Sequence, residues 1–72
     1  MALLYRKIFA QRLYQTMTER GLYPSDVEKL TGVGRQKIYD YINGTKEPRL
    51  CSFIKLVRGL NVSADWLCGL IE

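Results

Sequence analysis

Residues 33–44 combine an apolar face with a row of hydrogen-bonding side chains, within what the sequence predicts to be one short helix. At about 100° per residue, Ile38, Tyr41 and Ile42 fall on one face of that helix. The opposite face is polar, and its residues recur at helical spacing with a cation on either side: Gln36, Tyr39, Asp40 and Asn43, flanked by Arg35 and Lys37. A solvated helix usually exposes Glu and Lys, whereas Arg, Gln, Lys, Tyr and Asn are the side chains that hydrogen-bond base edges and phosphates. The chemistry indicated by this face is nucleic-acid recognition.

A second predicted helix precedes this one and would position it. It begins at Pro24-Ser25, where proline is well tolerated because its missing N–H would have no helical partner. Gly32 closes it, and the turn Thr31-Gly32-Val33 leads directly into the polar helix. Two helices joined by a tight glycine turn, the second with a recognition-type outer face, are typical of a helix-turn-helix motif. The sequence therefore predicts this motif over residues 24–43.

Three further helices are predicted, with no strand among them. The first runs from near Leu4 to Arg20, the fourth from about Arg49 to Leu60, and the fifth begins at Ser63 as its N-cap. The residues expected to form the core recur at helical spacing: Ile8, Phe9, Leu13, Met17, Val27, Leu30, Leu50, Phe53, Ile54, Leu56, Val57, Leu60, Trp66 and Leu67. Residues 1–7 are either an extension of the first helix or an arm. We expect an all-α fold of five helices.

The length and charge of the chain limit what it can be. Its 72 residues form one small domain over 1–72. The formal net charge is +4, and the excess lies in residues 1–20 and 31–50, whereas residues 51–72 balance to zero. Such a basic excess is compatible with a nucleic-acid partner. Scattered Lys and Arg residues that merely solubilise a small domain would give the same charge.

Other classes of function are made unlikely by what the sequence lacks. It has no His, no phosphate-cradling glycine motif and no carboxylate pair at dyad spacing, and so short a chain leaves little room for a substrate pocket. An enzyme is therefore not expected. Cys51 and Cys68 are expected to be free thiols, buried or half-buried, and two Cys are too few for an ordinary zinc site. No apolar run suits a membrane span or a signal peptide. We expect a cytoplasmic protein without cofactor, metal or small-molecule ligand.

Four stretches of the chain, taken together at their spacing, carry a resemblance to a known family. They are Arg12-Leu13 through Glu19-Arg20-Gly21-Leu22, Leu30-Thr31-Gly32-Val33, residues 38–48 (IYDYINGTKEP) and residues 60–67 (LNVSADWL). From about Phe9 to Leu70, the chain resembles the phage-repressor-type helix-turn-helix regulators, the Cro/C1-like or XRE-like family. The resemblance implies a compact five-helix domain like that of lambda repressor. It also implies sequence-specific binding of double-stranded operator DNA by a homodimer that controls transcription, with repression the expected role.

The resemblance further implies roles for particular positions. Residues 34–37 match the start of the recognition helix, which enters the major groove. The implied base-reading candidates are Arg35, Gln36, Lys37, Tyr39 and Asp40. The phosphate-binding candidates are Tyr23, Ser25, Gly34, Asn43, Gly44, Thr45 and Lys46, with the backbone N–H groups of Asn43 and Gly44 meeting phosphate. The dimer-contact candidates lie in the fifth helix and just after it: Trp66, Leu67, Leu70 and Ile71.

Each base-reading candidate has a specific chemistry. Gln36 would read adenine through its bidentate amide, and Arg35 or Lys37 would read guanine or hold phosphate. Tyr39 would touch a thymine methyl or a phosphate, or else lean on a neighbour along the helix surface. Asp40 would accept a hydrogen bond from a cytosine amino group, or else pair within the helix with Gln36 or Lys37.

The chain departs from the family pattern at the start of the motif. Glu28 stands where the family usually has a small residue. Its side chain must therefore point outward, pair with a basic residue such as Arg35, or spread the two helices. Tyr23-Pro24 replaces the usual Ser-Gln, so the phosphate contact there would be lost or would pass to Tyr23, Ser25 or a backbone N–H. Gly34 replaces the usual Ser or Thr cap, at a cost of a few tenths of a kcal/mol.

Three residues leave a second function open. Pro24, Glu28 and Asp40 would also suit a helix-turn-helix module that binds another protein, such as an antirepressor, with little affinity for DNA. The two functions differ in their response to salt, because a DNA reader loses affinity steeply as the salt concentration rises.

Overall fold

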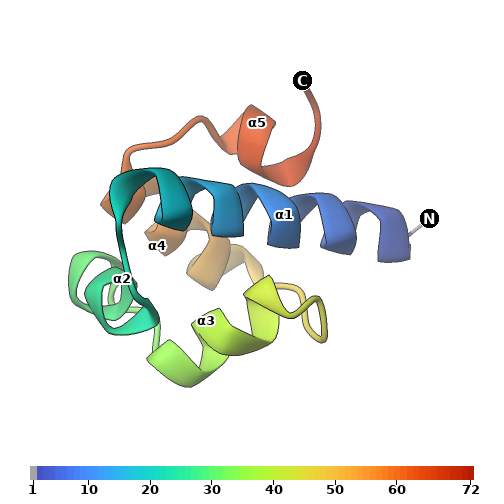
Figure 1. Ribbon diagram of the computed structural model, residues 1–72. Coiled ribbons are helices and arrows are strands. Elements are labelled where there is room, and N and C mark those ends of the chain that lie inside the picture. Colours follow the sequence, from blue (N-terminus) through green and yellow to red (C-terminus); the bar gives the residue numbers. More distant parts are fainter. Residues whose placement is uncertain (1) are drawn as a thin grey trace.

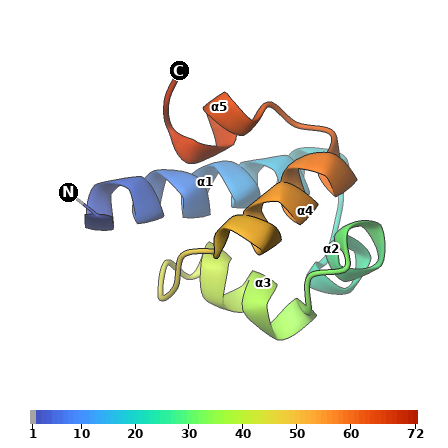
Figure 2. The ribbon, with the colours of Figure 1, turned by 180° about the vertical axis from the view of Figure 1, so that it is seen from behind.

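The computed structural model describes residues 2–72, and every regular element within that range is a helix. The helices are α1 (Ala2–Arg20), α2 (Pro24–Thr31), α3 (Arg35–Ile42), α4 (Leu50–Leu60) and α5 (Ala64–Cys68). In Figure 1, α1 runs across the middle of the molecule, with α5 above it and α2 and α3 below it. The view from behind presents α4 beside α1 and above α3 (Figure 2). The expected all-α fold of five helices is confirmed.

Helix α1 forms one wall of the core. Phe9, Leu13 and Met17 recur every four residues, as predicted, and each is at most 4% exposed. Thr16 is buried beside them, and its hydroxyl donates a hydrogen bond to the carbonyl oxygen four residues earlier at 2.9 Å. The helix already includes residues 2–7, so this stretch extends α1 and is not an arm. Met1 lies outside the described residues.

The buried face of α4 is rotated relative to the predicted one. Leu56 and Leu60 are buried and Phe53 packs partly against the core, whereas Leu50 is 75% and Ile54 41% exposed. The expectation that Leu50 and Ile54 belong to the core is therefore wrong. Ile54 lies about 100° around the helix from Phe53, off the face centred on positions 53, 56, 57 and 60. Leu50 is the first residue of α4, where the helix emerges from the preceding loop.

Gly59 explains how closely α2 and α4 pack. A Cβ atom at Gly59 would lie 2.6 Å from the Leu30 carbonyl oxygen and 2.8 Å from the Thr31 Cα atom. The backbone at the end of α2 thus packs directly against α4, and only a residue without a side chain leaves room for it. The Leu30 side chain is 53% exposed, so the expectation that Leu30 faces the core is also wrong. Val27 is the buried residue of α2.

Two arginines of α1 tie the C-terminal part of the chain to the rest. The guanidinium group of Arg12 donates hydrogen bonds to the carbonyl oxygens of Trp66 and, at 2.6 Å, Ile71. It also lies over the Trp66 ring, 5.3 Å from the ring centre. Arg20 donates a hydrogen bond to the Leu60 carbonyl oxygen at the end of α4. These two members of the basic excess are therefore engaged in holding the fold together.

Helix α5 begins as predicted. Ser63 is its N-cap, and the Ser63 Oγ atom accepts a hydrogen bond from the Trp66 N–H at 3.3 Å. Both cysteines are free, as expected, but Cys51 is exposed and only Cys68 is half-buried. The expected burial of Cys51 is wrong because this residue follows Leu50 on the exposed first turn of α4.

Candidate nucleic-acid interface

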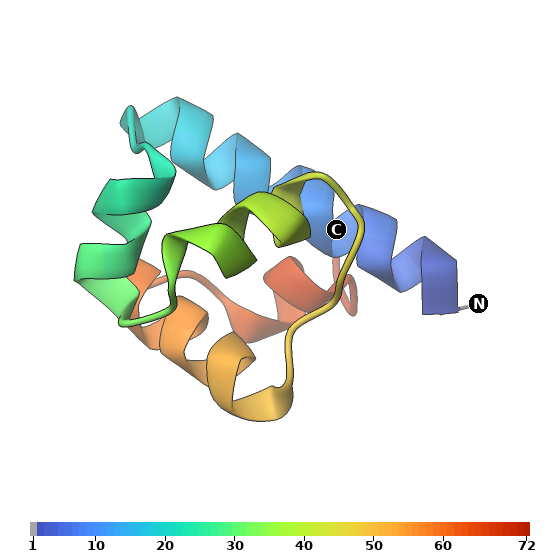
Figure 3. The ribbon, with the colours of Figure 1, turned by 90° about the horizontal axis from the view of Figure 1, so that it is seen from below.

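Helix α3 separates its buried and exposed residues as the sequence predicts. Ile38 and Tyr41 are at most 4% exposed and anchor the helix in the core, where the Tyr41 ring meets the Phe9 ring edge-on at 5.7 Å. The outer face carries four exposed base-reading candidates and one half-buried one: Arg35, Gln36, Lys37 and Tyr39, with Asp40 the half-buried residue. Seen from below, α3 lies across the front of the molecule, with α2 on one side and the loop 43–49 on the other (Figure 3). The face is thus free to enter a groove.

Glu28 pairs with the first residue of α3. The Arg35 Nε atom donates a hydrogen bond to the Glu28 Oε1 atom at 2.7 Å. Of the three possibilities for Glu28, the structure therefore shows an ion pair with a basic side chain. Both side chains remain partly exposed, 60% for Arg35 and 36% for Glu28, so the pair adds little stability. Its effect is to orient Arg35 and offset its charge.

Asp40 faces the loop that follows α3, where Lys46 Nζ lies 3.7 Å from its Oδ2 atom. The expected partners within the helix, Gln36 and Lys37, form no such contact with it in the part of the chain that the structure describes. The loop turns back because the backbone N–H and the hydroxyl of Thr45 both donate to the Asp40 carbonyl oxygen, each at 3.0 Å. This places Lys46 beside Asp40, and the alternative of a helical partner for Asp40 is wrong.

The backbone donors expected at the end of α3 are already used. The Asn43 N–H donates to the Tyr39 carbonyl oxygen at 3.0 Å, and the Gly44 N–H donates to the Tyr41 carbonyl oxygen at 3.1 Å. These bonds close the helix, and Gly44 adopts a φ of +76° that favours glycine. Both N–H groups are thus already bonded within the protein, and a contact between them and phosphate stays a prediction. The side chains of Asn43, Thr45 and Lys46 are exposed beside them.

The start of α2 is capped by a carboxylate. The Tyr23 N–H donates to the Asp26 Oδ2 atom at 2.8 Å, which satisfies one helix-terminal donor. Asp26 lies in the first turn of α2, where its charge also complements the helix dipole. Tyr23 itself is 74% exposed, whereas Ser25 is half-buried. Gly34, the N-cap of α3, provides no side-chain hydrogen bond and is half-buried.

The arrangement of α2 and α3 has a counterpart among known proteins. The chain matches the model of a helix-turn-helix family over residues 13–67, which include all of α2, α3 and α4. The chain belongs to this helix-turn-helix family, of the Cro/C1 type. The family is one of DNA-binding transcription regulators. No curated protein and no solved structure matches the chain.

The dimer-contact candidates of this helix-turn-helix chain differ in accessibility. Leu67 is fully buried, so it offers nothing to a partner and its expected role as a dimer contact is wrong. Trp66 is half-buried beneath Arg12. Leu70 and Ile71 are 73% and 52% exposed. Helix α5 ends at Cys68, and the N–H groups of Leu70 and Ile71 donate back to the Asp65 carbonyl oxygen at 2.8 and 3.3 Å, so both residues follow α5 in a turn.

Arg6 has a contact within the fold that the sequence did not indicate. Its Nη1 atom donates to the Thr45 carbonyl oxygen at 3.2 Å, and so α1 supports the loop after the recognition helix. Its Nε atom is buried without a hydrogen-bond partner. The bond joins residues 39 positions apart in the chain, which helical periodicity cannot indicate.

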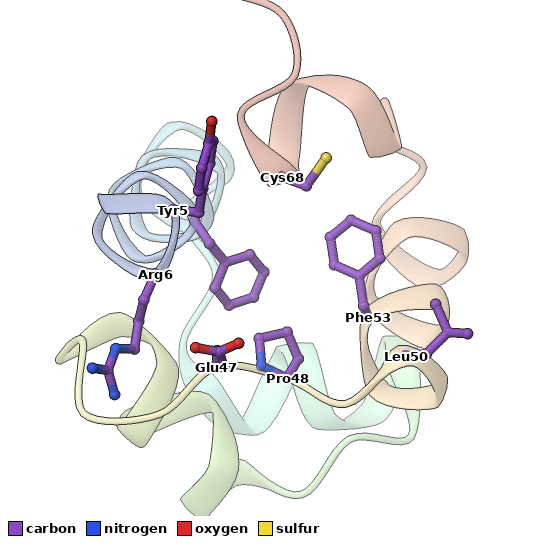
Figure 4. A pocket seen from close by; sticks show the side chains of 8 residues that line it. Tyr5, Arg6, Glu47, Pro48, Leu50, Phe53 and Cys68 are labelled. Carbon is purple, nitrogen blue, oxygen red and sulfur yellow. The ribbon is translucent and has the colours of Figure 1, made fainter. Parts of the chain in front are cut away.

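An open hollow of about 450 Å³ lies away from the helix-turn-helix motif. Its walls come from α1, the loop before α4, α4 and α5 (Figure 4), and none of the predicted site residues lines it. Its lining residues are Tyr5, Arg6, Phe9, Glu47, Pro48, Leu50, Phe53 and Cys68. The expectation that so short a chain lacks room for a pocket is therefore wrong.

The remaining features concern metals and membranes. Within residues 2–72, no group of three His, Cys, Asp or Glu side chains is arranged to hold a metal ion. None of the described helices is both long and apolar enough to span a bilayer.

Proposed function

We propose that the protein is a sequence-specific reader of double-stranded DNA that represses transcription. The observation that carries this proposal is the outer face of α3. Four exposed side chains with base- or phosphate-binding chemistry, Arg35, Gln36, Lys37 and Tyr39, lie there on a helix whose other face is buried in the core. Membership of a family of DNA-binding regulators supports the same function.

In this proposal α3 enters the major groove with its first turn closest to the bases. Gln36 reads adenine, and Lys37 reads guanine or holds a phosphate. Arg35 also reads guanine or holds a phosphate. It uses its two Nη atoms, because only the Nε atom is occupied by the bond to Glu28. Asp40 accepts from a cytosine amino group or holds Lys46 in place.

Phosphate contacts then fix the register of α3 on the duplex. Asn43, Thr45 and Lys46 contribute through their exposed side chains, on the loop that Arg6 supports from α1. At the other end of the motif, Tyr23 and Ser25 contribute from the start of α2. Gly34 and Gly44 allow the backbone to approach the duplex, since neither has a side chain.

We also propose that two copies bind one operator. A domain this small makes few contacts alone, and two-fold dimers of helix-turn-helix proteins bind half-sites about 34 Å apart. Leu70 and Ile71 support this, because both are exposed apolar side chains at the end of the chain. Trp66, half-buried, would contribute at the edge of that contact.

A second function, binding to a protein partner instead of DNA, is favoured by the two ion pairs. Glu28 offsets Arg35 and Asp40 offsets Lys46, so two cations on or beside α3 are paired with carboxylates. A surface of this kind attracts phosphate less strongly than one with free cations.

Titration of the protein with a mixed-sequence duplex at increasing salt separates the two functions. A DNA reader binds at low salt, and the logarithm of its affinity falls linearly with the logarithm of the salt concentration, with a slope set by its cationic phosphate contacts. Absence of binding at every salt concentration would reject DNA reading and leave the protein-binding function.

A further inference from the structure

We propose that Tyr14, Tyr23 and Tyr39 form one site for a phosphodiester of the DNA backbone, at the flank of α3. This inference rests on the proposed function and adds to it a residue from α1. It also assigns Tyr39 to the backbone instead of to a base.

The three tyrosines come from different elements and meet around one hollow. Tyr14 lies on α1, Tyr23 caps α2 and Tyr39 lies on α3. All three line a hollow of about 420 Å³, a volume within the range of ligand sites. The other lining residues are Met17, Thr18, Gly21, Leu22, Pro24 and Ile42.

These tyrosines are unusually exposed for aromatic residues. Tyr14 is 58%, Tyr23 74% and Tyr39 47% exposed. Within residues 2–72, none of their hydroxyl groups makes a hydrogen bond to another part of the protein. Tyr41, by contrast, is buried and packs edge-on against Phe9. The exposed phenols are therefore available to a ligand. Because all three line the same hollow, we infer that they bind one ligand together.

The lining of the hollow specifies the chemistry of that ligand. No charged residue lines it, so its polar contacts come from neutral hydroxyl groups. A phenol O–H donates readily to a phosphate oxygen. The apolar floor, which includes Met17, Leu22 and Ile42, suits the carbon skeleton of a deoxyribose. A phosphate with its adjoining sugar presents both kinds of surface together.

The position of the hollow agrees with this ligand. Tyr39 is one turn after Arg35 and Gln36 on the outer face of α3, so the hollow adjoins the base-reading residues. A helix in the major groove, which is about 12 Å wide, is bordered on both sides by the phosphates of the two strands. A hollow at the flank of α3 would consequently meet a strand backbone when the outer face meets the bases.

Neutral contacts give this site a distinctive signature. A phenol releases no counterion when it binds a phosphate, so losing its hydroxyl lowers affinity without changing the salt dependence. Losing a cation that contacts phosphate, by contrast, reduces by about one the magnitude of the slope of log affinity against log salt concentration. Since a backbone contact carries no sequence information, the loss should also be equal for unrelated duplexes.

The test compares the wild-type protein with Tyr14→Phe, Tyr23→Phe, Tyr39→Phe and the triple variant on two duplexes of unrelated sequence across a salt series. Tyr5→Phe is the matched control, because Tyr5 is 48% exposed and lines the other hollow. We expect each single variant to bind both duplexes about fivefold to tenfold more weakly. The triple variant should bind roughly a hundredfold to a thousandfold more weakly, with an unchanged salt slope. The control should bind as the wild type does.

Two results would overturn the inference while leaving the proposed function intact. The first is a triple variant that binds like the wild type. The second is a loss confined to one duplex, which would return Tyr39 to base reading. A wild-type protein that binds neither duplex would instead overturn the proposed function itself, and the inference with it. Circular dichroism of each variant checks that these exposed substitutions leave the helices folded.

Discussion

Arg35 and Glu28 join the two helices of the motif through a single hydrogen bond of 2.7 Å. The bond connects the first turn of α3 to the middle of α2, at a position where the family usually has a small residue. It lets a carboxylate occupy this position and leaves Arg35 on the outer face. A small residue at this position would let α2 and α3 pack closely. Glu28 instead links the two helices through a polar contact with Arg35.

Releasing Arg35 should strengthen DNA binding. In Glu28→Ala the guanidinium group has no carboxylate beside it, so we expect roughly threefold to tenfold tighter binding to any duplex and a salt slope steeper by about one. The stability should change by less than about 1 kcal/mol, because the pair is exposed. Affinity measured across a salt series checks the first expectation, and urea denaturation checks the second. Glu19→Ala, which removes the same charge from the exposed end of α1, is the control. An equal gain in both variants would contradict a local effect on Arg35.

Gln36 should account for part of the sequence preference. We expect Gln36→Ala to weaken binding to the operator by about 1–3 kcal/mol, since an adenine loses its bidentate partner. Binding to unrelated DNA should barely change. Gln15→Ala removes the same amide from an exposed position on α1 and should affect neither. Equal losses for Gln36→Ala on both kinds of DNA would rule out base reading.

Gly59 should be irreplaceable for stability. In most helix interiors, replacing Gly by Ala stabilises by up to about 1 kcal/mol. Here the new methyl group would meet the backbone of α2 at 2.6 Å, so we expect Gly59→Ala to destabilise by about 1–3 kcal/mol through overpacking. The midpoint of thermal or urea unfolding measures this. Arg58→Ala, at the exposed neighbouring position, should stay near the wild-type value. A stabilised Gly59→Ala variant would show that α2 and α4 are not in close contact.

Leu70 and Ile71 should hold the dimer together. We expect the double variant Leu70→Asp/Ile71→Asp to remain monomeric in sedimentation experiments at concentrations where the wild type is dimeric, because charges cannot be buried unpaired in an interface. Leu50→Asp is the control. Leu50 is about as exposed as Leu70, but it lines the hollow between α1, α4 and α5. Loss of the dimer in the control alone would move the interface to that hollow. A wild type that is monomeric both with and without DNA would reject the dimer.

Helical periodicity predicted much of this fold because it depends on neighbours along the chain. The stripe of Phe9, Leu13 and Met17, the cap at Ser63 and the split faces of α3 follow from spacing and residue type. The buried centre of α4 was misplaced for the same reason. A run with Leu, Phe, Ile and Val at many positions fits several overlapping stripes, and only the packing partners decide among them.

Contacts between distant segments were the part that the sequence did not reveal. An ion pair with a basic residue such as Arg35 was only one of three possibilities for Glu28, and no spacing rule favoured it. The pairing of Asp40 with Lys46 depends on a loop that turns back, and the bond that holds α5 against α1 joins Arg12 to the Trp66 carbonyl oxygen, 54 positions away in the chain. Gly59 gave no signal of its own, since an isolated glycine in a helical pattern has several possible causes. The exposed polar residues of α3 were predictable because helical spacing places them opposite Ile38 and Tyr41, which are buried.

Selection of bound sequences from a random duplex library at near-physiological salt tests the central claim most directly. If α3 of a two-fold dimer reads the major groove, the recovered sequences will share a pseudo-palindrome with half-sites about one helical turn, or about 34 Å, apart. Recovery of no sequence above background would contradict operator reading, and the search for a function would then turn to protein partners.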